Sequence, residues 1–258
     1  MKSKAYWRRE LLLIAKNQYH NSNTIVKRLA KQYKASFKEL DYQLAKLYVQ
    51  VLGDGEVSAT TLFKEDRYIK LKKAIIAEVN KLGGIEEKAI ADGLKTMYTG
   101  TIKQTNKLLG ISFTNIPAKQ VDKAIRTNWA GRNFADSVWD NKKLLAKTLD
   151  KTITDSIISG NSHDKTSAKL AQRCDVETWK AERLVRTETM NCINQGQKES
   201  YIDAGCTQYE FLAEIDDRTS AECEALNREI FNLGDAVTGD NYPPLHPNCR
   251  CTTLPVID

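Results

Sequence analysis

A chain of 258 residues, 41% hydrophobic and 28% charged, is long enough to bury a core and has an ordinary globular composition. Its longest apolar stretch, Leu11 to Ala15, is five residues, which excludes a membrane-spanning helix and is too short for an export signal. We therefore expect a protein made in a reducing cytoplasm, with its six cysteines as thiols or metal ligands.

The net charge of +6 conceals a gradient along the chain. Residues 1–50 hold eleven Lys and Arg against three Asp and Glu, whereas residues 201–258 hold three against eleven. A basic N-terminal region suits contacts with nucleic-acid phosphates that do not depend on sequence. The alternative is that the Lys-rich helix faces are only solvated.

The first predicted element is one long helix that ends at Gly53-Asp54-Gly55. Apolar residues recur there at spacings of three and four, which is typical of a helix packed against other helices and less often of a coiled coil. They are Val26, Leu29, Tyr33, Phe37, Leu40, Leu44, Leu47 and Val51. Basic residues fall largely off this stripe, so we expect a basic face with DNA-contacting candidates Lys27, Arg28, Lys31, Lys34 and Lys38.

The middle of the chain also has helical periodicity. We expect helices over 69–82 ending at Gly83-Gly84, over 90–109 ending at Gly110, and one or two between 121 and 158. Another is expected over 176–204, closed by Gly205, with Ser162 or Asp164 as a cap for the segment before it.

After Gly205 the period changes to two, which predicts a strand over 209–215. A short helix over 220–226 and strands near 229–232 and 252–257 complete a small α+β unit. The predicted fold is mainly α, with a basic helical region (1–52), a central helical region (53–200) and a small α+β C-terminal domain (201–258).

The segment PPLHPNCRC brings histidine and cysteine together near the C-terminus. Cys223, His246, Cys249 and Cys251 offer three thiolates and one imidazole, a ligand set that suits tetrahedral zinc. The single cysteine in the first half makes the spacing unusual for zinc. Prolines that fix an extended turn around buried cysteines are the alternative, and a Cys249–His246 nucleophile pair is a weaker one.

Two further polar clusters have structural interpretations. Asp216, Asp217 and Arg218 follow the predicted strand, where paired carboxylates usually belong to a turn. Arg186, Thr187 and Glu188 lie on a predicted helix, where an ion pair that docks the helix on the C-terminal unit is favoured over a catalytic glutamate. Phosphate-binding glycine loops, hydrolase elbows and HExxH helices are absent from the sequence, so we expect a structural or binding protein and no enzyme.

Five blocks in order resemble tailed-bacteriophage minor head proteins of the Mu F-like head-morphogenesis family. They are AYWRRE, NWAGRNFADSVWDN with IISGNS, AERLVRTETMNCINQGQKESYIDAG, FLAEIDDRTSAECEALNREIFNL and PPLHPNCRCTTLP. The resemblance covers essentially the whole chain and is most specific over 183–255. The family's recurring positions fall on Arg186, Thr187, Glu188, Asp216, Arg218, Thr219, Cys223, Pro243, Pro244, His246, Cys249 and Arg250.

The resemblance implies a minor protein of the phage head, assembled in the bacterial cytoplasm and located in the capsid interior or at the portal vertex. Its implied partners are the portal protein, the major capsid or scaffold protein, and double-stranded DNA without sequence preference; no membrane is implied. Many relatives carry a cysteine where this chain has Ser220, and others a serine at Cys251, so the turn can be built without a metal. A zinc-binding or catalytic C-terminal module is the alternative, since related modules are sometimes fused to toxins.

Overall fold

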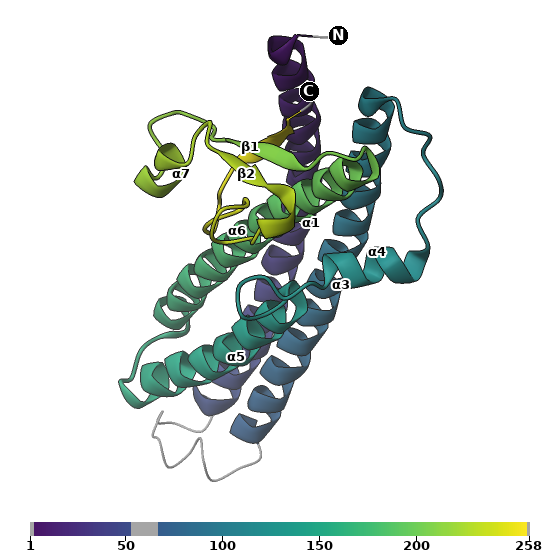
Figure 1. The fold of residues 1–258 in the computed structure, drawn as a ribbon. Coiled ribbons are helices and arrows are strands. Elements are labelled where there is room, and N and C mark those ends of the chain that lie inside the picture. Colours follow the sequence, from purple (N-terminus) through teal and green to yellow (C-terminus); the bar gives the residue numbers. More distant parts are fainter. Residues whose placement is uncertain (1–2, 53–66, 257–258) are drawn as a thin grey trace. The chain divides into compact units, whose positions relative to one another are not determined.

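The computed structural model describes residues 3–52 and 67–256 (Figure 1). Six α-helices lie in these residues, and a small antiparallel sheet follows near the C-terminus. The predicted fold class, mainly α with a small α+β C-terminal part, is confirmed. The helices are α1 (Lys4–Leu52), α3 (Arg67–Leu109), α4 (Ala118–Ile125), α5 (Phe134–Ile158), α6 (His163–Asp203) and α7 (Ala221–Ala225).

The sheet has the strand order β2-β1-β3, with β1 (Gln208–Leu212) between β2 (Ile230–Asn232) and β3 (Thr252–Pro255). Tyr209 pairs with Phe231 on one side and Pro255 on the other. The four residues of β1 after Gln208 are all buried, so both faces of this central strand are covered. Burial on both faces explains why the alternation over 209–215 was imperfect. The expected strand also ends earlier, at Leu212.

The expectation that Gly83-Gly84 would end a helix is wrong, because α3 continues through both glycines. A Cβ atom at Gly83 would lie 2.9 Å from the ring of Trp139 and 3.1 Å from Cγ of Lys142. Gly83 therefore allows α5 to approach α3 closely, and a residue chosen for close packing resembles a helix stop in the sequence.

Two other helices are longer than expected. The first begins at Lys4, well before Val26, and α6 begins at His163 instead of residue 176. Ser162 accepts a hydrogen bond from the backbone N–H of Lys165 at 3.4 Å, so of the two expected caps the serine is the one that acts. The region from 121 to 158 forms two helices, α4 and α5.

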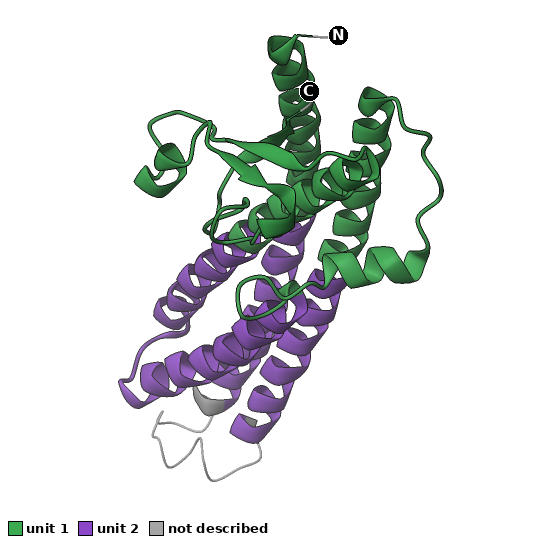
Figure 2. Cartoon of the chain, viewed as in Figure 1, with its two compact units in different colours: residues 1–26, 89–134, 183–258 green, residues 27–88, 135–182 purple. Residues whose placement is uncertain are grey.

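The chain divides into two compact units (Figure 2). Unit 1 contains residues 1–26, 89–134 and 183–258, and unit 2 contains residues 27–88 and 135–182. The expected regions 1–52, 53–200 and 201–258 are consecutive segments, whereas each unit is built from several segments. None of the helices in the described ranges is apolar over enough of its length to cross a membrane.

Each unit has its own apolar core. The stripe of α1 packs in unit 2 through Leu40, Leu44 and Leu47, together with apolar residues of α3, α5 and α6. In unit 1, Leu11 and Ile14 of α1 pack with Tyr201 of α6 and with the sheet. A second cluster in unit 1 surrounds the cysteines and contains Phe211, Ala213, Cys223, Leu245, Cys249 and Cys251.

Candidate metal centre

Three cysteines of unit 1 meet in one buried cluster. Cys223 comes from α7, and Cys249 and Cys251 come from the segment just before β3. Their sulfur atoms all lie within 4.8 Å of one another, and Cys223 Sγ is 3.8 Å from Cys249 Sγ. Tetrahedral zinc with Zn–S bonds of about 2.3 Å has an S···S edge of about 3.8 Å. The cluster has the spacing and ligand type to hold a metal ion.

His246 directs its Nε2 atom toward this cluster. Its Nδ1 lies 2.9 Å from the carbonyl oxygen of Pro247, which can only accept a hydrogen bond, so Nδ1 is the donor. Nε2 lies 3.2 Å from Cys223 Sγ. A histidine that donates through Nδ1 can offer Nε2 to a metal ion. The structure thus brings three of the four sequence candidates into one cluster, Cys223, Cys249 and Cys251, and the fourth, His246, contacts this cluster through Cys223.

The pKa values of the three thiols are shifted in different directions. Hydrogen bonds from Cys223 and Cys251 lower the pKa of Cys249. The pKa of Cys223 is raised to about 11, first because of its hydrogen bond with Cys249, and the pKa of Cys251 is raised by its hydrogen bond with Cys223. A bound cation would displace the protons of these thiols, because a metal ion binds the thiolate form.

Ser220 is the residue that precedes the first turn of α7. Its side chain caps α7 by accepting a hydrogen bond from the backbone N–H of Cys223 at 3.2 Å. Its Oγ also lies 3.0 Å from His246 Nε2. The serine therefore orients two of the candidate ligands, and the site keeps its geometry without a cysteine there.

An ion pair between Arg250 and Asp216, which we call the Arg250–Asp216 clasp, holds the segment between Cys249 and Cys251. Arg250 donates to both carboxylate oxygens of Asp216, at 2.7 and 2.6 Å. Asp216 is fixed in a turn, since it accepts from the backbone N–H of Arg218 at 2.9 Å and donates its own N–H to Thr219 Oγ1 at 2.7 Å. The hydrogen bonds of Arg250 hold the pKa of Asp216 far below its usual range. The carboxylate therefore serves as a structural anchor for Arg250.

Helix α6 binds the C-terminal segment through a row of polar side chains. Thr187 accepts from the backbone N–H of Asn248 at 3.0 Å, and Asn194 donates to the carbonyl of Cys251 at 3.1 Å. Gln197 accepts from Thr252 Oγ1 at 2.6 Å, and Tyr201 donates to the carbonyl of Thr253 at 2.9 Å. We call Thr187, Asn194, Gln197 and Tyr201 the α6 ladder. Only Thr187 was a sequence candidate; polar residues at helical spacing within an apolar face were the signal for the others.

The neighbours of Thr187 have different partners. Glu188 is buried and accepts from Trp129 Nε1, which lies 3.3 Å from both of its oxygens. Burial raises the pKa of Glu188 to about 7. The guanidinium of Arg186 lies 5.4 Å from the centre of the Tyr19 ring. Within this motif, the contact with the C-terminal segment is made by Thr187, and the contact of Glu188 with Trp129 was not indicated by the sequence. Pro244 is buried and follows Pro243 through a cis peptide bond.

The five DNA-contacting candidates lie on α1 in unit 2, and all five are exposed. Lys27, Lys31, Lys34 and Lys38 fall within about 60° of arc on a regular helix. The expected basic face is thus present on the surface of α1.

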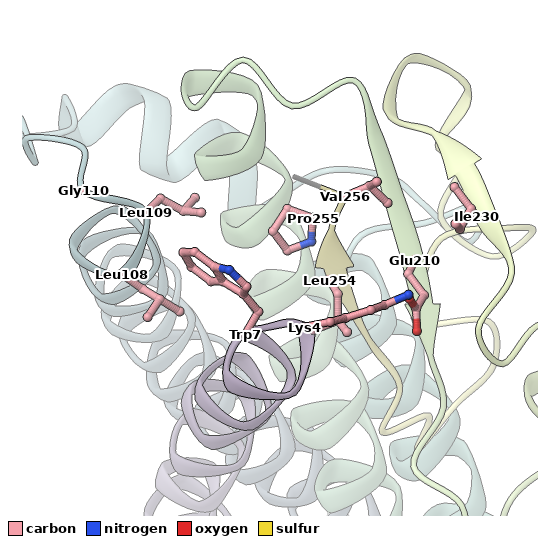
Figure 3. Close-up of a pocket in the computed structure, with 10 residues that line it drawn as sticks. All are labelled: Lys4, Trp7, Leu108, Leu109, Gly110, Glu210, Ile230, Leu254, Pro255 and Val256. Atoms are coloured by element: carbon pink, nitrogen blue, oxygen red, sulfur yellow. The ribbon is translucent and has the colours of Figure 1, made fainter. Parts of the chain in front are cut away.

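Unit 1 also has an apolar pocket of about 450 Å³ (Figure 3). Trp7 of α1 faces Leu108 and Leu109 at the end of α3, and Leu254 and Pro255 form the opposite wall. Lys4 reaches across to Glu210, with 2.6 Å between its Nζ and the carboxylate. The two charged groups of the lining are therefore paired with each other, and the lining does not have the convergent polar groups of a catalytic site.

Residues 147–254 match the family described as Phage Mu protein F like protein. The chain is 22% identical over 265 residues to an NAD(+)–arginine ADP-ribosyltransferase, EFV, of Enterococcus faecalis, an alignment covering 90% of this chain and 54% of that protein. The chain thus spans about half the length of this curated relative, and no solved structure matches it. Residues 147–254, which contain the cysteine cluster and the α6 ladder, are a Phage Mu protein F-like domain.

Proposed function

We propose that this chain is a minor structural protein of a phage head, located in the capsid interior or at the portal vertex. It acts in head morphogenesis and in the handling or ejection of packaged DNA, and it is no enzyme. The proposal rests on the observation that polar residues of the domain make their hydrogen bonds and ion pairs within the domain. Thr187, Asp216 and Arg250 are engaged with other parts of the domain, as expected for a structural module.

We propose that α1 contacts double-stranded DNA through its basic face, without reading the bases. Lysines at one-turn intervals along a helix suit contacts with backbone phosphates better than with base edges. If Arg28 and the four lysines each neutralise one phosphate, log K should fall against log salt with a slope of about −4.5. Affinity should then drop about 500-fold between 50 and 200 mM salt.

A filter-binding series over that salt range tests this role. Replacing Lys27, Lys31, Lys34 and Lys38 by glutamine should weaken binding and flatten the slope to about −1. The control replaces four other exposed lysines of unit 2, Lys73, Lys88, Lys147 and Lys151, and has the same net charge. Equal loss in both variants would argue against a defined DNA face on α1.

The portal protein is the proposed main partner, with the major capsid or scaffold protein as a further one. Co-purification with the portal protein tests this. Deleting residues 1–52 would be uninformative, because Leu11, Leu29 and Leu44 are buried and their removal would disrupt both cores. Charged substitutions at the exposed Tyr42 and Val49 probe α1 without touching a core. Failure of the wild-type protein to co-purify, together with its absence from purified virions, would contradict the proposed location.

We propose that Cys223, His246, Cys249 and Cys251 bind one structural zinc ion. Four protein ligands leave no position for a catalytic water, so the metal would join α7 to the C-terminal segment and supply no chemistry. Elemental analysis should find about one zinc per chain, lost in Cys249→Ser and retained in Cys206→Ser, whose sulfur lies outside the cluster. Metal-free protein with unchanged thermal stability would favour the alternative of a turn held by prolines.

The similarity to an ADP-ribosyltransferase supports the alternative of a catalytic module, and a direct assay separates the two. The assay incubates the purified chain with NAD⁺ and an arginine-rich acceptor peptide, and mass spectrometry measures any transfer of ADP-ribose. We expect none. An acceptor that gains ADP-ribose with the purified chain alone would establish an enzyme.

A further inference from the structure

A second, smaller pocket of unit 1 lies beside the Arg250–Asp216 clasp and has a volume of about 210 Å³. Lys16 and Tyr19 of α1 line one side, and Met190 of α6 lines another. Arg218 and Arg250 complete it. Three basic side chains that are far apart in the sequence thus converge on one cavity, in the unit that contains the acidic end of the chain.

Carboxylates at the pocket position these cations but occupy only some of their N–H donors. Arg250 donates two of its five N–H groups to Asp216, and Lys16 Nζ lies 3.1 Å from Glu214. Arg218 is 3.9 Å from Asp216, beyond hydrogen-bonding distance. The side chain of Arg250 is only 18% exposed, so its position is well defined. Donors remain in excess over acceptors around the cavity.

The pocket carries a net positive charge. The lining contains three cations and one carboxylate, Glu214. A second carboxylate, Asp216, is paired with Arg250, and the guanidinium of Arg186 lies 5.4 Å from the ring of Tyr19 in the wall. Leu12, Ala15 and Met190 form an apolar part of the lining, and low-dielectric walls strengthen the field on a bound anion. The volume is sufficient for a tetrahedral oxyanion.

We propose that this pocket binds a phosphate group through Lys16, Arg218 and Arg250. Donors that approach from three elements suit the several oxygens of phosphate, and arginine presents its N–H groups in a geometry that matches them. The phosphate is either free inorganic phosphate or the terminal phosphate of a nucleic acid. The site is separate from the basic face of α1 and does not depend on the proposed DNA contact there.

The test compares the full chain with Lys16→Gln/Arg218→Gln, two positions whose side chains are 60% and 71% exposed. The control, Lys103→Gln/Lys119→Gln, removes two other exposed cations of unit 1 and has the same net charge. Inorganic phosphate is titrated calorimetrically at constant ionic strength. A second arm compares one short duplex carrying 5′-phosphates with the same duplex carrying 5′-hydroxyls.

We expect wild type and control to bind phosphate at millimolar or lower concentration, and the pocket variant at least about tenfold more weakly. A preference for the 5′-phosphorylated duplex that the pocket variant loses assigns the ligand to nucleic-acid ends. Binding of inorganic phosphate without that preference assigns it to the free ion. Absence of both in the wild-type protein, or equal weakening in both variants, overturns the proposal.

Discussion

Arg250 and Asp216 are 34 positions apart and form a two-pronged ion pair, with both guanidinium Nη atoms on the two carboxylate oxygens. The pair joins the turn after β1 to the residue between two of the candidate metal ligands. Removal of either partner would therefore free Cys249 and Cys251 from one of the contacts that position them.

The acid stability of the protein should report this pair. The folded-state pKa of Asp216 lies below its ordinary value of 3.8, so its contribution to stability is present above that pH. It is lost as the pH falls below 3.8 towards the folded-state pKa. Denaturation midpoints measured across this range should fall more steeply for wild type than for Asp216→Asn. Asp217→Asn, at the exposed neighbouring carboxyl, should follow wild type, and parallel curves for all three proteins would refute the contribution.

Glu188 should make the protein less stable as the pH rises. Its folded-state pKa of about 7 lies above the ordinary value of 4.5, so the folded state binds more protons than the unfolded state between these values. Stability should decline over this interval by about 3 kcal/mol and then level off. Glu188→Gln should remove the decline, because glutamine can still accept from Trp129 without ionising. Urea denaturation at several pH values measures the difference, and a variant that declines as wild type does would contradict this assignment.

Adjacent glycines in α3 should respond in opposite directions. Gly83→Ala would place a methyl group 2.9 Å from the Trp139 ring, and we expect a loss of about 1–3 kcal/mol from overpacking. A Cβ at Gly84 meets nothing within 4 Å, so Gly84→Ala should gain about 0.5–1 kcal/mol of helix propensity. Equilibrium denaturation in guanidinium compares the pair, and a gain in both variants would mean that α5 can retreat from Gly83.

A buried ion pair in unit 2 should be more costly to break than to replace. Lys142 Nζ lies 2.7 Å from Glu86 Oε2, and both side chains are 1% exposed. Tyr33 donates to the same carboxylate oxygen at 2.7 Å. Lys142→Met leaves a buried charge without its cation and should cost about 3–5 kcal/mol.

The companion variant Glu86→Gln/Lys142→Met removes both charges and keeps an acceptor for Tyr33. It should recover most of the loss, as measured by denaturation of the single and double variants. A double variant no more stable than Lys142→Met would show that the loss comes from packing of the lysine stem.

The sequence allowed the helices and the C-terminal strands to be predicted, because period and capping are local properties. Leu29, Leu40 and Leu44 lie in the cores as the stripe of α1 indicated. Helix ends were less predictable wherever a residue served a distant contact. Gly83 has the chemistry of a helix stop, but its role depends on Trp139, which is 56 positions away and cannot be identified from local periodicity.

The candidate site was predictable to the extent that it depends on unusual residue types. Cys223, His246, Cys249 and Cys251 stood out by chemistry, and the structure clusters the three cysteines and sets His246 against Cys223. Asn194 and Gln197 did not stand out, because a polar residue on a helix is ordinary until the strand that it binds is known. Trp129 likewise lies on a loop whose contact with Glu188 depends on the tertiary fold.

The segmented composition of unit 1 has a consequence for synthesis of the chain. Leu11 and Ile14 lie far ahead in the sequence of the partners that bury them, which include Tyr201, Tyr209, Tyr242 and Leu254. Every segment of unit 2 lies within residues 27–182, so unit 2 has all its parts once residue 182 has been synthesised. The contacts of Leu11 and Ile14 with the sheet form only after residues up to Leu254 have been synthesised. Until then these two apolar side chains lack those partners, and β3 completes their cover.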